Sequence, residues 1–129
     1  MTEAQLKTDG FFNWNAPNLE GVESDRTPIP FDHTTDYLEE KIQKWHKDRD
    51  LISGSTDKDQ LAKLIQEVGE LSDHICKEES LVDDIGDIMV VLINIAHRNN
   101  IQLVEALSHA YMDIKDRKGT MIDGVFVKE

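Results

Sequence analysis

The sequence predicts an all-α fold of four helices, with an irregular arm before them and a short extended tail after them. Two observations support this class. Apolar residues recur at helical spacing in four stretches between about residues 34 and 116. The chain has 129 residues, enough for one domain but not for two full cores. We therefore assign residues 1–32 to the N-terminal arm and residues 33–129 to a single helical domain.

The two ends of the chain lack helical periodicity. The arm contains all three prolines and mixes Gly and Asn with Phe11, Phe12 and Trp14. Because fully disordered segments are poor in aromatics, we expect the arm to pack on its own domain or on a neighbouring subunit. At the other end, Gly119 and Gly124 break helicity, and residues 125–127 are predicted to be extended.

The four helices are expected at about residues 34–49, 56–77, 80–98 and 102–116. Thr56 or Asp57 can cap the second helix, and Ser80 is the expected cap of the third. From Ile88 to Ile93 the third helix is apolar on every side, as in helices that are buried all round. A domain of this size rarely buries a whole helix by itself. We therefore expect a homo-oligomer, in which a partner subunit covers the exposed side. The alternative is that the N-terminal arm covers this helix.

The composition excludes some classes of function. The formal net charge is −12, with 26 acidic and 14 basic residues, which argues against binding to a nucleic-acid polymer. Cys76 is the only cysteine, so no disulfide can form within the chain. We see no signal peptide, and the longest apolar run is far too short to span a membrane. A soluble, cytoplasmic protein is therefore expected.

Two acidic pairs border the apolar stripes of the second and third helices. Glu67 and Glu70 are three residues apart, as are Asp84 and Asp87, so each pair occupies one helix face. If the two helices form an antiparallel hairpin, the four carboxylates converge. Such a cluster is repulsive without a cation and suits Mg²⁺ or Mn²⁺, which prefer oxygen ligands. The alternative is a solvated acidic face without a ligand.

The segment "KLIQEVGEL" followed by "DDIGDIMVVL" resembles the MazG-type, all-alpha NTP pyrophosphatases. Their signature is EExxE followed by ExxD on the next helix, and the resemblance covers roughly residues 38–117. The tail also resembles that of small, phage-type MazG-like proteins. The resemblance implies hydrolysis of a (deoxy)nucleoside triphosphate to the monophosphate and pyrophosphate with Mg²⁺ or Mn²⁺, by a MazG-like protomer in an oligomeric bundle. We expect a homodimer or homotetramer, located in the host cytoplasm if a phage encodes it.

Residue by residue, the resemblance makes four acids the metal ligands: Glu67, Glu70, Asp84 and Asp87. Lys63, one turn before Glu67, matches a family lysine near the nucleotide phosphates, and Glu67 is the candidate catalytic base. This chain departs from the family at three positions. Gln66 stands where the first Glu of the motif is common, Asp84 replaces the usual Glu, and Tyr111 stands where many members have Asn.

Other side chains are candidates for substrate contact. Trp45 could stack on a nucleobase or belong to the core. Asn94 could bind the sugar or base, or form a structural hydrogen bond between helices. Three cations near the end of the fourth helix could contact phosphate or merely interact with the helix dipole: Lys115, Arg117 and Lys118. His74 follows Glu70 by four residues, not the three of a di-iron ExxH motif, so we expect it to support the site or to lie on the surface.

Two rival functions stay open on the sequence alone. The first is a catalytically silent regulator that binds nucleotides, because Gln66 removes one acid of the family motif. The second is a helical oligomerisation module whose acidic faces bind no ligand. Metal-dependent nucleotide binding would exclude the module, and turnover would exclude the regulator.

Overall fold

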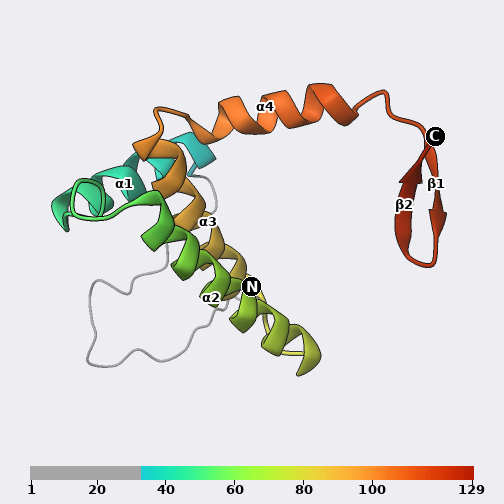
Figure 1. The fold of residues 1–129 in the computed structure, drawn as a ribbon, viewed down its shortest axis with the longest axis horizontal. Helices are drawn as coiled ribbons and strands as arrows, with labels where there is room; N and C mark the ends of the chain where they lie inside the picture. The colour runs from blue at the N-terminus through green and yellow to red at the C-terminus, as the bar shows by residue number, and fades with distance from the viewer. Residues whose placement is uncertain (1–32) are drawn as a thin grey trace. The chain divides into compact units, whose positions relative to one another are not determined.

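A computed structural model of the chain describes residues 33–129, and the chain divides into two units, Met1–Thr34 and Thr35–Glu129. The predicted arm, with its aromatic residues, lies outside the described residues. The second unit is mostly helical, as predicted, and ends in a small two-stranded antiparallel sheet (Figure 1). Its elements are α1 (Thr35–Asp48), α2 (Asp57–Cys76), α3 (Val82–Arg98), α4 (Leu103–Ile114), β1 (Gly119–Ile122) and β2 (Val125–Lys128).

Helices α2 and α3 form an antiparallel hairpin, which is the condition under which the acidic pairs were expected to converge, and α1 also packs on α3. Contacts at both ends of the hairpin establish the direction. Near the turn, His74 of α2 bonds Asp84 of α3. At the open end, Asn99 after α3 bonds the carboxylate of Asp57 at the start of α2. The acidic pairs of the two helices therefore lie on neighbouring elements.

The helix ends follow local chemistry. Thr56 caps α2 in a capping box with Asp59, as its position predicts. The expected cap of α3 was wrong by one position: Leu81 is the N-cap residue, and the Ser80 hydroxyl only accepts a bond from the Val82 amide at 3.4 Å. The first three helices each end through a non-glycine residue in the left-handed region, namely Asp50, Glu78 and Asn100.

A side chain from α1 caps α4. The side chain of Gln102, the N-cap residue, makes no capping bond, and instead the Leu103 amide donates to Oε2 of Glu39 at 2.8 Å. Glu39 is only 5% exposed although it is charged. A carboxylate at a helix N-terminus satisfies a free backbone donor and interacts favourably with the helix dipole.

We predict that Glu39→Ala destabilises the fold by about 1–2 kcal/mol, the usual cost of losing a capping side chain. Urea unfolding of the variant would measure the loss. Glu40→Ala is the matched control because Glu40 is an exposed neighbour on the same helix, and its midpoint should stay close to that of the wild type. Equal midpoints for the two variants would contradict the capping role.

Polar side chains of α3 anchor the loop between α1 and α2. Asn94 has no exposed surface, and its amide donates to the Leu51 carbonyl at 3.0 Å. Arg98 donates to the carbonyls of Leu51 and Ser55 and to the Asn94 side-chain oxygen. Because buried carbonyls need donors, these bonds fix the loop that leads into α2.

The C-terminal tail is a β-hairpin, so the predicted single extended segment was incomplete. Strand β1 pairs with β2 in a register that places Ile122 opposite Val125. Only Asp123 and Gly124 remain in the turn, and both have positive φ, of 51° and 82°. That geometry is the two-residue turn for which Asp-Gly is a preferred sequence. The "DG" dipeptide between apolar residues was the signal for the first strand.

His46 is a titratable group in the interior. It is 2% exposed, and its Nδ1 atom is buried without a hydrogen-bond partner. Burial, followed by the nearby His97 and Arg98 of α3, lowers the pKa of His46 from its ordinary value of 6.5. The folded chain therefore holds His46 neutral at pH values where the unfolded chain protonates it.

We predict that this histidine makes the fold less stable as the pH falls below about 6.5, because the unfolded state takes up the proton first. Urea midpoints at pH 7.5 and at pH 5.5 would measure the loss. In His46→Leu the loss should shrink, whereas His109→Leu, at an exposed site on α4, should keep it. Other titrating groups, including the carboxylates of α2 and α3, affect all three proteins alike and cancel in the comparison. An equal pH dependence in all three would contradict this assignment.

Much apolar surface is left uncovered in the single chain. Between residues 33 and 129 only three hydrophobic side chains are buried, Val91, Ile93 and Leu103. The apolar stripe of α2 is partly exposed, with Ile65 at 63% and Val68 at 47%. The all-apolar stretch of α3 is only partly covered: Leu92 is 36% exposed, and Ile88 is half-buried. No helix between residues 33 and 129 has the length and apolar character needed to cross a bilayer.

Candidate metal centre

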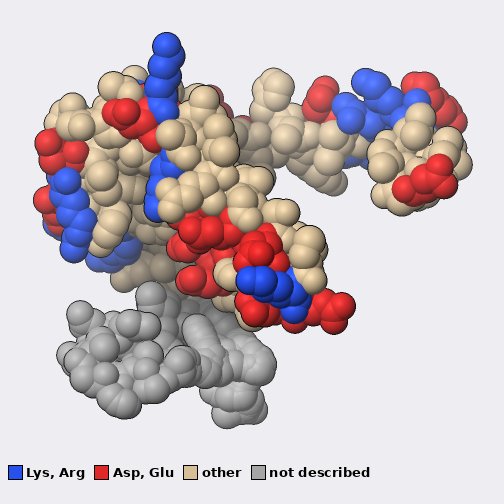
Figure 2. Space-filling model, turned by 60° about the horizontal axis from the view of Figure 1, so that its bottom comes forward, with Lys and Arg blue, Asp and Glu red and all other residues tan. Residues whose placement is uncertain are grey.

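The four predicted metal ligands lie on the two facing helices of the hairpin. Glu67 on α2 and Asp84 on α3 are buried, at 5% and 2% exposure. Asp87 is half-buried, and Glu70 is exposed. Acidic side chains gather along this hairpin toward its turn (Figure 2). The two carboxylates nearest the interior are thus one from each predicted pair.

The charges of these acids act on one another. The pKa of Asp87 is raised, first because burial disfavours its charge and then because other carboxylates are near. Those carboxylates belong to Asp83, Glu67, Asp84 and Glu70. All four predicted ligands are therefore members of one electrostatic cluster. A bound cation would reduce the repulsion between these carboxylates.

Lys63 is part of the same cluster. Its ammonium group lies 3.0 Å from Oε2 of Glu67, one helical turn away. The hydrogen bond and the charge of Glu67 raise the pKa of Lys63, and Glu70 and Asp87 add to the effect. Lys63 is about half exposed, so its charged end can also contact a ligand from solvent. The structure thus places Lys63 beside Glu67 and close enough to Glu70 and Asp87 for their charges to act on it.

Glu67 retains an unused acceptor. Its Oε1 atom is buried and has no hydrogen-bond partner, whereas Oε2 pairs with Lys63. A buried carboxylate oxygen without a donor is costly, so it is rare unless a ligand, ion or water supplies the partner. The oxygen donors of the cluster are of the type that Mg²⁺ and Mn²⁺ prefer, so the residues present fit the predicted cofactor in kind.

Within residues 33–129, His74 is the one hydrogen-bond partner of the Asp84 side chain. The Nδ1 atom of His74 lies 2.7 Å from Oδ2 of Asp84, and Nε2 of the same ring lies 3.5 Å from Oε1 of Glu79. The hydrogen bond to Asp84 is the main cause that raises the pKa of His74. His74 therefore lies beside a predicted ligand, which agrees with the expected supporting position.

The carboxylate side chains are not arranged as a chelating site. Within residues 33–129 no group of three Asp, Glu, His or Cys side chains is arranged to hold a metal ion. The helices place the acids on neighbouring faces, but their side-chain oxygens do not meet at one point. Binding of a cation at this cluster would therefore require side-chain rotation, which the exposed Glu70 and the half-buried Asp87 can make more easily than buried side chains.

Two predicted substrate contacts have other partners in the chain. Asn94 is fully buried with both ends of its amide engaged, by Leu51 and by Arg98. These bonds are structural, but they join α3 to a loop and to itself, not to another helix as the structural alternative expected. Trp45 is 45% exposed, so it is not a core residue of the described chain. The Arg49 guanidinium lies 4.4 Å from the centre of its ring. An exposed indole leaves the stacking prediction open.

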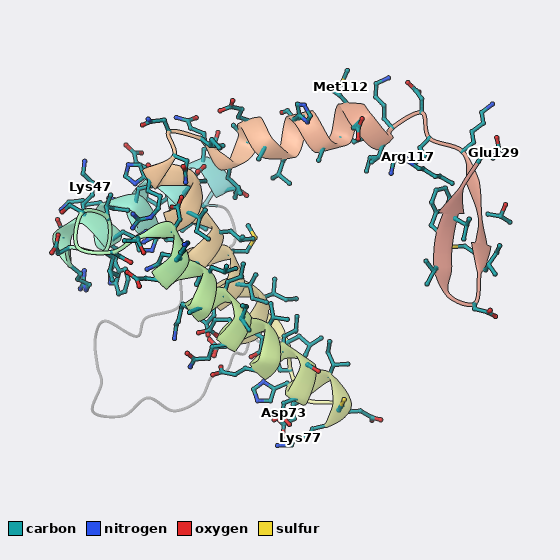
Figure 3. The ribbon with its side chains drawn as sticks, viewed as in Figure 1. Lys47, Asp73, Lys77, Met112, Arg117 and Glu129 are labelled. Atoms are coloured by element: carbon teal, nitrogen blue, oxygen red, sulfur yellow. The ribbon has the colours of Figure 1, made fainter. Side chains whose placement is uncertain are left out.

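The three predicted C-terminal cations pair within their own segment. Lys115 contacts Asp116 at 2.9 Å, and Arg117 contacts Asp113 at 3.3 Å. Arg117 lies just beyond the end of α4 (Figure 3). No ion pair or side-chain hydrogen bond of Lys115, Arg117 or Lys118 within the described chain reaches α2 or α3. A contact with phosphate at the acidic cluster therefore stays a prediction for these cations.

Two features of the acidic cluster were not predicted from the sequence. Asp83 was not among the predicted site residues, but its charge contributes to raising the pKa of Asp87. The contact between His74 and Asp84 joins residues ten positions apart, and only the packing of the hairpin brings them together. The available signal was the short turn at residues 77–80, which brings the end of α2 close to the start of α3.

Comparison with known proteins gives a partial match. A stretch of 69 residues, 52% of this chain, is 39% identical to an uncharacterized 18.2 kDa protein in the rep–hol intergenic region of Haemophilus phage HP1 (strain HP1c1). The match spans 42% of that phage protein, less than half of its length. No protein-family model matches the chain, and no solved structure matches it.

Proposed function

We propose that the chain is a MazG-like pyrophosphohydrolase, which hydrolyses (deoxy)nucleoside triphosphates to the monophosphate and pyrophosphate with Mg²⁺ or Mn²⁺. The observation that carries the proposal is the carboxylate cluster of α2 and α3, where Glu67 has a buried oxygen without a partner. A cluster of like charges at a packed helix interface is unfavourable for the empty protein. Such a cost is typical of a site that is built for a ligand.

Each side chain has a role in the proposed reaction. Glu67, Glu70, Asp84 and Asp87 would hold the divalent cation. The cation, when bound, would neutralise phosphate oxygens and make water a stronger nucleophile. Water attacks the α-phosphorus, its proton passes to the Glu67 carboxylate, and the bond to the bridging oxygen breaks as pyrophosphate leaves. Lys63, paired with Glu67, would stabilise the charge on the phosphate chain.

A nucleotide panel tests the proposal. Each dNTP and NTP is incubated with the protein and Mg²⁺ or Mn²⁺, and pyrophosphate release is measured with and without chelator. The expected result is metal-dependent release from a subset of the nucleotides, lost in Glu70→Ala. Folded protein that releases no pyrophosphate from any nucleotide would contradict the catalytic proposal. Nucleotide binding would then separate the silent regulator from the plain helical module.

We also propose that the chain functions as a homodimer or homotetramer. The exposed apolar residues of the hairpin form stripes on both helices: Leu61, Ile65, Val68 and Ile75 on α2, and Val82, Ile85 and Leu92 on α3. Gly69 and Gly86 lie in the same two helices, and a Cβ at either position would meet no atom within 4 Å. Packing within one chain does not explain these glycines, whereas close approach of a second chain would.

The oligomer makes a testable prediction. Light scattering after gel filtration should give the wild type a mass that is two or four times 14.7 kDa. Ile65→Glu places a charge on the most exposed apolar residue of the α2 stripe and should shift the mass to that of the monomer. Lys58→Glu, also an exposed position of α2, is the control that adds acid outside the stripe and should leave the mass unchanged. A monomeric wild type at tens of micromolar would contradict the proposal.

A further inference from the structure

His74 makes a contact with Asp84 and has no role in the reaction proposed above. Its ring lies at the turn of the hairpin, on α2, and bridges two acids that follow in the chain. The short contact, 2.7 Å, is with Oδ2 of Asp84, and the long one, 3.5 Å, is with Glu79. The imidazole itself is about one-third exposed, whereas Asp84 is almost completely buried.

The hydrogen bond fixes the state of the ring. An ionised carboxylate can only accept hydrogen bonds. Nδ1 must therefore carry a hydrogen and donate a hydrogen bond to Oδ2 of Asp84. Between residues 33 and 129 no other donor bonds the Asp84 carboxylate. Within this part of the chain, His74 therefore holds one oxygen of Asp84, and no donor bonds the second oxygen, Oδ1. A carboxylate has acceptor sites for more than one partner, so a second partner is expected.

We infer that His74 is a positioning residue of the metal centre, which holds Oδ2 of Asp84 and thereby keeps Oδ1 available to the cation. This inference rests on the proposed function, since it assigns the second partner of Asp84 to a divalent metal. Buried ligands commonly need such an outer hydrogen bond to keep the orientation that the metal requires. His74 itself contacts no substrate and takes no part in the reaction.

A purely structural role makes a different prediction. If His74 only neutralises a buried acid, its loss lowers the stability of the fold but leaves the metal affinity of the folded protein unchanged. If it orients Asp84, its loss weakens metal binding in protein that is still folded. Stability alone does not separate the two roles, so the deciding quantity is the Mn²⁺ dissociation constant of the folded protein without nucleotide.

The test is a Mn²⁺ titration followed by electron paramagnetic resonance, on the full-length wild type and three variants. His74→Leu removes the donor and should weaken Mn²⁺ binding about 10- to 100-fold. His74→Asn places an amide N–H close to the position of Nδ1 and should stay within about threefold of the wild type. His109→Leu, at an exposed site of α4, should match the wild type.

The results separate the inference from the function on which it rests. A His74→Leu protein that binds Mn²⁺ as tightly as the wild type overturns the positioning role and leaves the enzyme proposal standing. Failure of His74→Asn to restore binding overturns it as well. If His74→Leu does not fold, His74→Gln replaces it, because its amide lies nearer the position of Nε2. A wild type that neither binds Mn²⁺ nor releases pyrophosphate overturns both proposals.

Discussion

The Glu67→Gln variant is expected to lose pyrophosphohydrolase activity by about 10²- to 10⁴-fold, the usual contribution of a positioned acid or base. Its fold should survive. Glu67 is buried beside acids that repel it, and one of its oxygens has no partner. Replacing its charge with a neutral amide of the same shape therefore removes repulsion from the metal-free protein. We expect the thermal midpoint without metal to stay the same or to rise.

This combination of lost activity and kept stability is what marks a functional acid. Initial rates of pyrophosphate release and thermal unfolding of the metal-free protein measure the two quantities on the same preparation. Glu105→Gln is the control, since Glu105 is an exposed acid on α4, and it should match the wild type in both. A Glu67→Gln protein that unfolds at much lower temperature would instead show that Glu67 serves the fold through its pair with Lys63.

The Arg98→Met variant is expected to show the largest loss of stability, about 3–5 kcal/mol from the loss of three charge-assisted hydrogen bonds. The Arg98 side chain is 10% exposed and donates to two backbone carbonyls and to Asn94. Methionine fills much of the same volume but donates nothing, so the carbonyls of Leu51 and Ser55 lose donors. For a domain of about 100 residues this corresponds to a fall of roughly 15–30 °C in the thermal midpoint.

Thermal unfolding at fixed protein concentration measures the effect of Arg98→Met, because oligomers unfold in a concentration-dependent way. Arg49→Met is the matched control. Arg49 is exposed and contacts mainly the ring and carbonyl of Trp45, so its loss should cost less than about 1 kcal/mol. If the two variants unfold at similar temperatures, the anchoring of the loop by Arg98 is wrong.

Local sequence patterns predicted the helices well. Periodic apolar residues and the Thr56 cap located α2 within a residue or two, because those signals act within one or two turns. The antiparallel hairpin was considered only as a condition, and the few residues between α2 and α3 are consistent with it. The placement of the acidic pairs on facing helices depended on the same condition.

Contacts between residues far apart in the chain could not be predicted from the sequence. The cap of α4 comes from Glu39, 64 positions away, and nothing near Leu103 indicates it. The burial of His46 and Asn94 likewise depends on how α1 and the following loop meet α3. At the candidate site the sequence predicted which acids share a face, but not that their oxygens stop short of a chelating arrangement. Side-chain rotamers are decided by packing and by ligands, which the spacing of residues does not encode.

The central claim is that the carboxylates of the hairpin serve hydrolysis between the α- and β-phosphates of a nucleotide. The most direct test is a ³¹P spectrum of the products formed from the best nucleotide of the panel with Mg²⁺. We predict equal amounts of nucleoside monophosphate and pyrophosphate, and no reaction with Glu67→Gln. Formation of the diphosphate and inorganic phosphate, or no product from folded wild-type protein, would contradict the claim.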